Sequence, residues 1–229
     1  MASTFYKSLI YIQQHKFAFL LFGLIQHLYI GMTGISHQFY ESYMWPITMV
    51  VLGICSVGVF NRTKLWAKAL GYFLLFGVMG TSVIFPIFGY EVIVVKTISM
   101  MYTAYFLYIA WGIRDCLFRP RTMSNDIIWA SASGYFLLIE IAVFWLMFFY
   151  AGDSSAISGI DDTAIPTVYM DMVYFATISQ STVGFGDITP VLPAARLTSA
   201  FMAAVGQLYI VLLVGVLISR YAGNRSSSK

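Results

Sequence analysis

Residues 176–190, ATISQSTVGFGDITP, decide the fold of this chain. Gly184 and Gly186 alternate with larger residues there, and Pro190 ends the loop on its far side. Successive backbone carbonyls face one axis when left- and right-handed conformations alternate, and glycine adopts a positive φ without steric cost. A ring of such carbonyls can replace the hydration shell of a cation. A lone G-x-G also occurs in ordinary turns, so the surrounding sequence has to decide between the two interpretations.

The context favours the carbonyl-lined loop. A short helix is predicted over Thr167–Ser179, and long apolar segments flank the unit. The run Thr182–Asp187 resembles the selectivity filter of the tetrameric potassium-channel family, which usually reads TVGYG followed by Asp. The resemblance covers about residues 127–219 and is strongest over 174–190. For the filter Thr182, Val183, Gly184, Phe185 and Gly186, it implies potassium binding by the first four carbonyls and the Thr182 hydroxyl. It also implies a homotetramer, in which three identical subunits complete the ring.

The sequence departs from the family pattern in two places. Phe185 replaces the usual Tyr, which leaves the carbonyl chemistry unchanged but removes a hydroxyl that ties the filter to neighbouring aromatic residues. Ile178 stands where some relatives carry a buried Glu behind the filter. Tyr174 stands where relatives often use Trp, and a hydrogen bond from Tyr174 to Asp187 is expected. The alternative is that Asp187 simply faces the outer water.

Composition places the chain among membrane proteins. Of its 229 residues, 59% are hydrophobic and 10% are charged, whereas a soluble domain has about 25% charged residues. The net charge of +3 is not a signal for nucleic acid. The sequence has no phosphate-binding loop, no His/Cys cluster at metal spacing and no nucleophile–base pattern, so neither an enzyme nor a cofactor is expected. The expected partners are potassium ions, the lipid bilayer and further copies of the chain.

A membrane-spanning helix needs about 20 apolar residues. The sequence predicts an all-α membrane protein with six spans and a re-entrant unit, Pro166–Asp187, between the last two. The predicted spans are Phe17–Ile35, Met44–Phe60, Trp66–Phe85, Val92–Ile113, Ile127–Tyr150 and Leu197–Ser219. Non-helical backbone at membrane depth is tolerated only where it lines a cavity inside protein.

The distribution of basic residues predicts the orientation. The terminal segments and alternate connections, with the helix ends beside them, carry the basic residues Lys7, Lys16, Arg62, Lys64, Lys68, Arg114, Arg119, Arg121, Arg220, Arg225 and Lys229. The other connections carry His37 and acidic residues. Both termini are therefore expected on the cytoplasmic side of the plasma membrane, with the filter open to the outside. A cleaved signal peptide is the weaker alternative, because no cleavage pattern follows the first apolar run. Residues 3–15 are expected to form a short interfacial helix.

The polar stretch Arg114–Asp126 divides the chain into two predicted parts. Residues 1–121 form a four-helix membrane domain, and residues 122–229 form a pore domain. The order of spans resembles voltage-gated channels, whose fourth span carries basic residues at three-residue spacing. Here Val92–Ile113 contains Lys96 alone, so gating by voltage is not expected.

Three ionisable residues, Lys96, Glu140 and His27, lie inside predicted spans. Such residues are costly in a membrane and often functional. An ion pair between Lys96 and Glu140 is expected to join the fourth and fifth spans. A purely structural role for that pair is the favoured interpretation. His27 is more simply explained as a hydrogen-bonded packing residue than as a pH sensor.

The resemblance also assigns the inner pore. Gly206 lies twenty positions beyond Gly186, where the family often places a hinge in its inner helix. Close helix packing is the alternative for this glycine. The same alignment places Gln207, Ile210 and Val214 near the cavity, where the last two would form a hydrophobic gate.

A passive potassium-selective channel is therefore the leading hypothesis for the function. A potassium transporter subunit is one alternative, although such proteins typically carry four degenerate filter repeats in one chain and this chain has one motif. A non-conducting membrane sensor built on the four N-terminal helices is the other. Recording single channels from purified protein would separate the three.

Overall fold

The computed structural model describes residues 15–34, 36–60, 65–88, 91–118 and 125–226. The predicted interfacial helix at residues 3–15 lies almost wholly outside this part. Helices dominate, and a single two-stranded ladder accompanies them in the described residues. The long helices are α2 (Lys16–Tyr29), α4 (Trp45–Val57), α5 (Leu65–Phe88), α6 (Val92–Phe118), α7 (Asn125–Gly152), α8 (Ile165–Gln180) and α9 (Pro193–Ser226). The short elements are η1 (Ile30–Thr33), α3 (His37–Phe39), η2 (Tyr40–Met44), η3 (Gly58–Phe60), η4 (Ser154–Ala156), β1 (Ile157–Ser158) and β2 (Thr189–Pro190).

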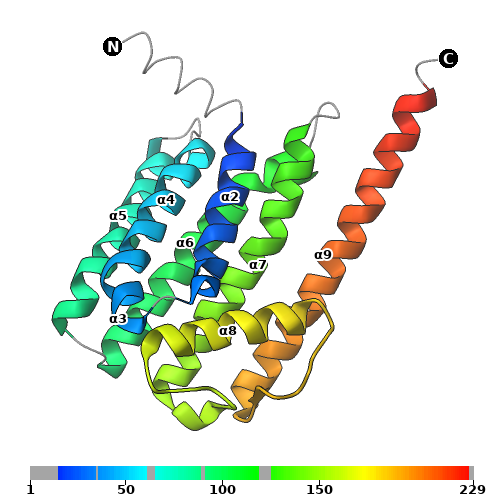
Figure 1. Ribbon diagram of the computed structural model, residues 1–229. Coiled ribbons are helices and arrows are strands. Elements are labelled where there is room, and N and C mark those ends of the chain that lie inside the picture. Colours follow the sequence, from blue (N-terminus) through cyan, green and yellow to red (C-terminus); the bar gives the residue numbers. More distant parts are fainter. Residues whose placement is uncertain (1–14, 35, 61–64, 89–90, 119–124, 227–229) are drawn as a thin grey trace, which may run out of the picture.

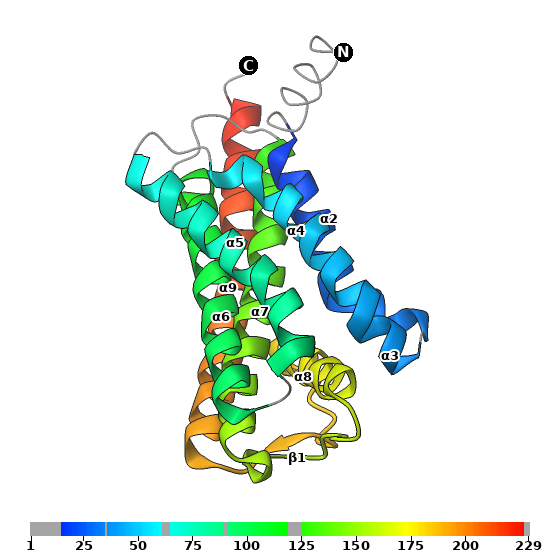
Figure 2. The same ribbon diagram turned by 90° about the vertical axis from the view of Figure 1, so that its left-hand side faces the viewer.

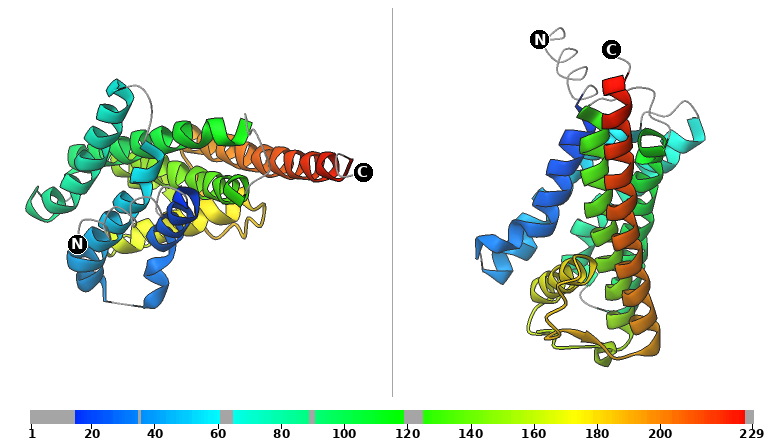
Figure 3. Two further views of the ribbon diagram at one scale, coloured as in Figure 1. Left: turned by 90° about the horizontal axis from the view of Figure 1, so that it is seen from above. Right: turned by 90° about the vertical axis from the view of Figure 1, so that its right-hand side faces the viewer.

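The helices other than α8 run roughly side by side, and α8 lies across one end of this bundle (Figure 1). The beginning of α2 and the end of α9 lie at the opposite end. The core is formed mainly by α2, α4, α6, α7 and α8, whose buried side chains make one continuous apolar cluster. Helix α9 lies at the edge of the bundle, where it packs against α7 and α8 (Figure 3).

Several helices are long and apolar enough to cross a bilayer, so the protein is a multi-pass membrane protein. Within the described residues the qualifying segments are Lys16–Thr33, His37–Phe60, Val92–Arg114, Asp126–Gly152 and Pro193–Leu213. A shorter apolar segment covers Leu65–Thr81, within α5.

The second of these segments begins earlier than the predicted Met44. Its first part contains a wide π-helical turn, in which the amide of Trp45 donates to the carbonyl of Tyr40. Pro46 follows directly and has no amide hydrogen to donate. The residues before Met44 include the polar His37, Gln38 and Glu41, so the apolar pattern placed the start of this segment too late.

Candidate functional site

The re-entrant helix α8 carries the candidate site. It begins beside Pro166, where a missing amide hydrogen costs nothing, and ends at Gln180, close to the predicted Ser179. Beyond its end the chain turns back onto the helix. The carbonyl of Ile178 accepts the amides of Val183 (2.9 Å) and Gly184 (3.2 Å). The loop of residues 181–187, here called the filter loop, is therefore anchored to the C-terminal end of α8.

The backbone of the filter loop alternates in handedness. Gly184 has a φ of 51° and Gly186 a φ of 81°, as expected from the sequence. Thr182 also has a positive φ, of 62°, and is the only such non-glycine residue in the described chain. Positive φ at every second position turns successive carbonyls toward the same side of the loop. Sequence reasoning did not foresee the third left-handed position, because a β-branched residue rarely adopts it.

One side of the filter loop is uncovered in the single chain. Val183 is 54% exposed and Phe185 is 72% exposed, although both are large apolar residues. An added Cβ at Gly184 or Gly186 would meet no atom within 4 Å. The loop is thus fixed at one end on α8, while Val183 and Phe185 stay largely exposed in the single chain.

The outer end of the loop is held by Tyr174 of α8. Its hydroxyl donates to the Oδ2 atom of Asp187 at 2.7 Å, which is the expected bond. Its ring stacks on Phe185, with ring centroids 6.5 Å apart and an interplanar angle of 9°. The hydrogen bond from Tyr174 lowers the pKa of Asp187 below its ordinary value of 3.8. Phe185 therefore has an aromatic neighbour although it lacks a hydroxyl.

A short ladder closes the base of the re-entrant unit (Figure 2). Ile157 of β1 is paired with Pro190 of β2, and Ser158 with Thr189. Gly159, with a φ of 88°, follows the ladder and lies against the carbonyl of Asp187, where a side chain would collide. Sequence reasoning missed Gly159.

The inner end of α8 meets α7 and α9 through Gln180, another residue that sequence reasoning missed. The Nε2 atom of Gln180 donates to the carbonyl of Leu138 at 3.0 Å. The carbonyl of Gln180 accepts from Nε2 of Gln207, also at 3.0 Å. An added Cβ at Gly206 would lie 3.1 Å from Gln180 Oε1. Helix α9 is continuous through Gly206, and the glycine makes the contact that the packing alternative requires.

Ile210 and Val214, the two residues assigned to the gate, lie further along α9. Ile210 is half-buried on α9. The side chain of Val214 lies outside the described part of the structure, so its assignment to a gate stays a prediction. Potassium binding by the filter carbonyls also stays a prediction.

The expected pair between Lys96 and Glu140 is wrong. Glu140 is fully buried and pairs with His27, with 2.7 Å between Oε1 and Nδ1. The Nζ atom of Lys96 instead lies 5.3 Å from the ring centre of Phe148 and against Gly152. Glu140 and Gly152 are twelve residues apart on α7, about 18 Å along the axis. Lys96 thus lies at the C-terminal end of α7, where the helix dipole favours a cation.

Residues 133–222 match the family model described as "Ion channel". This stretch begins within α7 and ends within α9, and so contains α8 and the whole filter loop. The match supports an ion channel function and extends over the part of the chain that carries the site. No curated protein and no solved structure matches the chain.

Proposed function

We propose that the protein is a potassium-selective channel that conducts passively across the membrane. The observation that carries this proposal is the positive φ at every second position, Thr182, Gly184 and Gly186. The loop that contains them is anchored to the C-terminal end of the re-entrant helix. Such a backbone presents carbonyl oxygens in a row, and rings of carbonyls are how a pore replaces the hydration shell of potassium. The proposed ligands are the carbonyls of residues 182–185 and the Thr182 hydroxyl.

The proposal includes a homotetramer, because one chain supplies one quarter of a closed carbonyl ring. The exposed apolar residues of the filter loop support it. Helix α9 gives further support, since large apolar side chains on it are exposed in the single chain. They are Leu197, Phe201, Leu208, Val211 and Leu212. In the tetramer these residues would face lipid or neighbouring copies.

We further propose six spans, with both termini in the cytoplasm and the filter loop at the outer face of the plasma membrane. Helix α5 runs from Leu65 to Phe88, and its 24 residues are long enough for the third span. The start of α2 and the end of α9 lie at one end of the molecule and the filter loop at the other (Figure 1). This arrangement agrees with the orientation that the distribution of basic residues predicts.

Purified protein in planar bilayers tests the proposal. Single-channel currents should reverse near the potassium equilibrium potential under opposed potassium and sodium gradients. Native mass spectrometry of the same sample should give the mass of four chains. A silent tetramer would favour the non-conducting sensor, coupling of flux to a second ion would favour a transporter subunit, and an unselective current would refute the assignment of the filter loop.

A further inference from the structure

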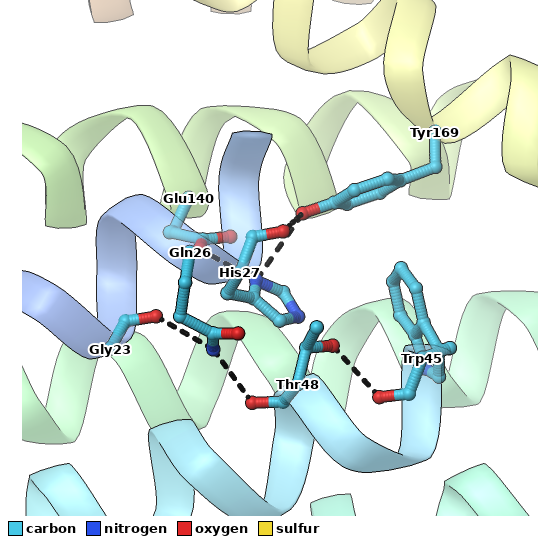
Figure 4. A network of polar contacts seen from close by, with 7 residues as sticks. All are labelled: Gly23, Gln26, His27, Trp45, Thr48, Glu140 and Tyr169. Atoms are coloured by element: carbon cyan, nitrogen blue, oxygen red, sulfur yellow. Dashed lines mark hydrogen bonds and ion pairs between the residues drawn. The ribbon is translucent and has the colours of Figure 1, made fainter. Parts of the chain in front are cut away.

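The outer end of α2 contacts the re-entrant helix α8 at two places. The hydroxyl of Tyr169 lies 3.3 Å from the carbonyl oxygen of His27 and 3.3 Å from its Nδ1 (Figure 4). The hydroxyl of Tyr29 lies 3.0 Å from Oγ1 of Thr177. Tyr169 and Thr177 are eight residues apart, so the two contacts are separated by about 12 Å along α8. Two contacts at this spacing fix the direction of α8 as well as its position.

The first contact satisfies a carbonyl that α2 leaves free. Helix α2 ends at Tyr29, and the last four carbonyls of a helix have no partner within it. The Tyr169 hydroxyl donates to one of them, that of His27. The Nδ1–H of His27 can then donate to Glu140 Oε1, at 2.7 Å. With this assignment α2, α7 and α8 are joined at one point, here called the His27 clamp (His27, Glu140 and Tyr169).

The clamp is enclosed by apolar and aromatic side chains. His27, Glu140 and Tyr169 are each no more than 1% exposed. The Trp45 ring is T-shaped against Tyr169, with centroids 4.7 Å apart, and the Phe144 ring lies 6.4 Å from that of His27. Polar bonds in such surroundings are strong, and a partner left alone is costly. The clamp therefore strongly favours one arrangement of the three helices.

The second contact leads directly to the filter loop. Thr177 precedes Ile178, whose carbonyl holds the amides of Val183 and Gly184. A shift of α8 therefore moves the anchor of the loop. Helix α9, by contrast, packs against α7, α8 and β2 and lies apart from α4 and α5 in Figure 1.

We infer that the His27 clamp positions the filter loop, so that the four N-terminal helices act on conduction at the filter rather than at the inner helix. His27, Glu140 and Tyr169 are positioning residues in this scheme, because all three are buried within the chain and reach the filter loop only through α8. The inference rests on the proposed function. A stimulus that shifts α2 would be transmitted through α8 to the carbonyl ring.

The test uses full-length protein in bilayers, with two readouts that report on the filter. They are the sodium-to-potassium permeability ratio and the rate of current loss after external potassium is replaced by sodium. Tyr169→Phe removes one buried hydroxyl and should raise both by about tenfold. His27→Leu should do the same, whereas His27→Asn keeps an amide N–H near the place of Nδ1 and should restore most of the wild-type behaviour. The double variant should differ little from either single variant, because both break one clamp.

Tyr105→Phe is the matched control. The Tyr105 hydroxyl is equally buried and bonds Ser56 Oγ at 2.8 Å, between α6 and α4 and away from α8. It should lower thermal stability like Tyr169→Phe while leaving both filter readouts unchanged. If Tyr169→Phe does not assemble, Tyr29→Phe at the second contact takes its place. Assembled clamp variants with wild-type readouts would overturn the inference, while a wild type without selective potassium current would refute the proposed function instead.

Discussion

Thr182 shows how the filter loop is held in an unfavourable backbone conformation. A positive φ at a β-branched residue costs about 1–3 kcal/mol and persists only where the surroundings impose it. Here the amides that follow are fixed to the carbonyl of Ile178, and Oγ1 of Thr182 donates to the carbonyl of Ser181 at 2.6 Å. Hydrogen bonds within the chain itself therefore hold the loop in this conformation.

Replacement of Gly184 by Ala should abolish selective potassium conduction. Its φ of 51° is strained for any residue with a Cβ, and relaxation would turn a carbonyl away from the axis. Reversal potentials under opposed sodium and potassium gradients measure the effect.

Gly34→Ala is the control for this substitution. Gly34 has a φ of 66° and equally open space around an added Cβ, but it lies at the end of η1. It should cost a similar amount of stability, about 1–2 kcal/mol, and leave selectivity intact. Selective current through Gly184→Ala would contradict the role given to the loop.

The bond between Tyr174 and Asp187 should make the outer mouth resistant to acid. Because the pKa of Asp187 is lowered, the bond is fully present above pH 3.8 and is lost only as the pH falls through that lowered value. Potassium current should therefore not titrate through Asp187 between about pH 7 and 5.

In Tyr174→Phe the pKa of Asp187 should rise toward its ordinary value, so the acid midpoint of the current should move upward. Asp187→Asn identifies the group, since it should show no such midpoint. An unchanged midpoint in Tyr174→Phe would show that the bond does not control the ionisation of Asp187.

The junction of α8 with α9 is tightly packed. Gly206→Ala would bring a Cβ to 3.1–3.2 Å from Gln180, and such overpacking costs about 1–3 kcal/mol. Gly80→Ala, in α5, meets no atom within 4 Å and should instead gain up to about 1 kcal/mol from helix propensity. Thermal unfolding of the assembled protein compares the two. An equal gain in thermal stability for both variants would favour the hinge alternative for Gly206.

Local chemistry explains which elements the sequence predicts well. The filter loop and α8 follow from one continuous stretch, residues 165–187, and the bond from Tyr174 to Asp187 joins residues thirteen positions apart within it. The pairing of Glu140 with His27 joins residues 113 positions apart. It depends on the depth and rotation of α2 and α7, which hydropathy does not determine. Lys96 was therefore assigned the wrong partner, although its place inside a helix was predicted correctly.

The fourth of the N-terminal membrane helices, α6, lacks the charges that steep voltage gating requires. About 3–4 charges per subunit are needed, each contributing about 2.3 kcal/mol per 100 mV. In α6 the basic residue within the predicted span is Lys96, which is half-buried against Phe148 and Gly152. Its contacts at the end of α7 oppose any movement through the membrane field.

Normalised conductance should accordingly change little between about −100 and +100 mV in symmetrical potassium. Lys96→Met should leave this relation unchanged, apart from weak rectification that arises in the pore. A steep sigmoid that disappears in Lys96→Met would show that α6 is a voltage sensor.

The ladder between β1 and β2 brings the two ends of the re-entrant unit together. Ile157 faces Pro190, and the amides of Val191 and Leu192 both donate to the carbonyl of Ala156. Residues 157–190 thus form an insert whose first and last residues lie side by side. Such a unit could be grafted between other pairs of helices. Insertions before Ala156 or after Leu192 would leave its internal spacing unchanged, whereas a length change inside it would alter how far the loop reaches into the membrane.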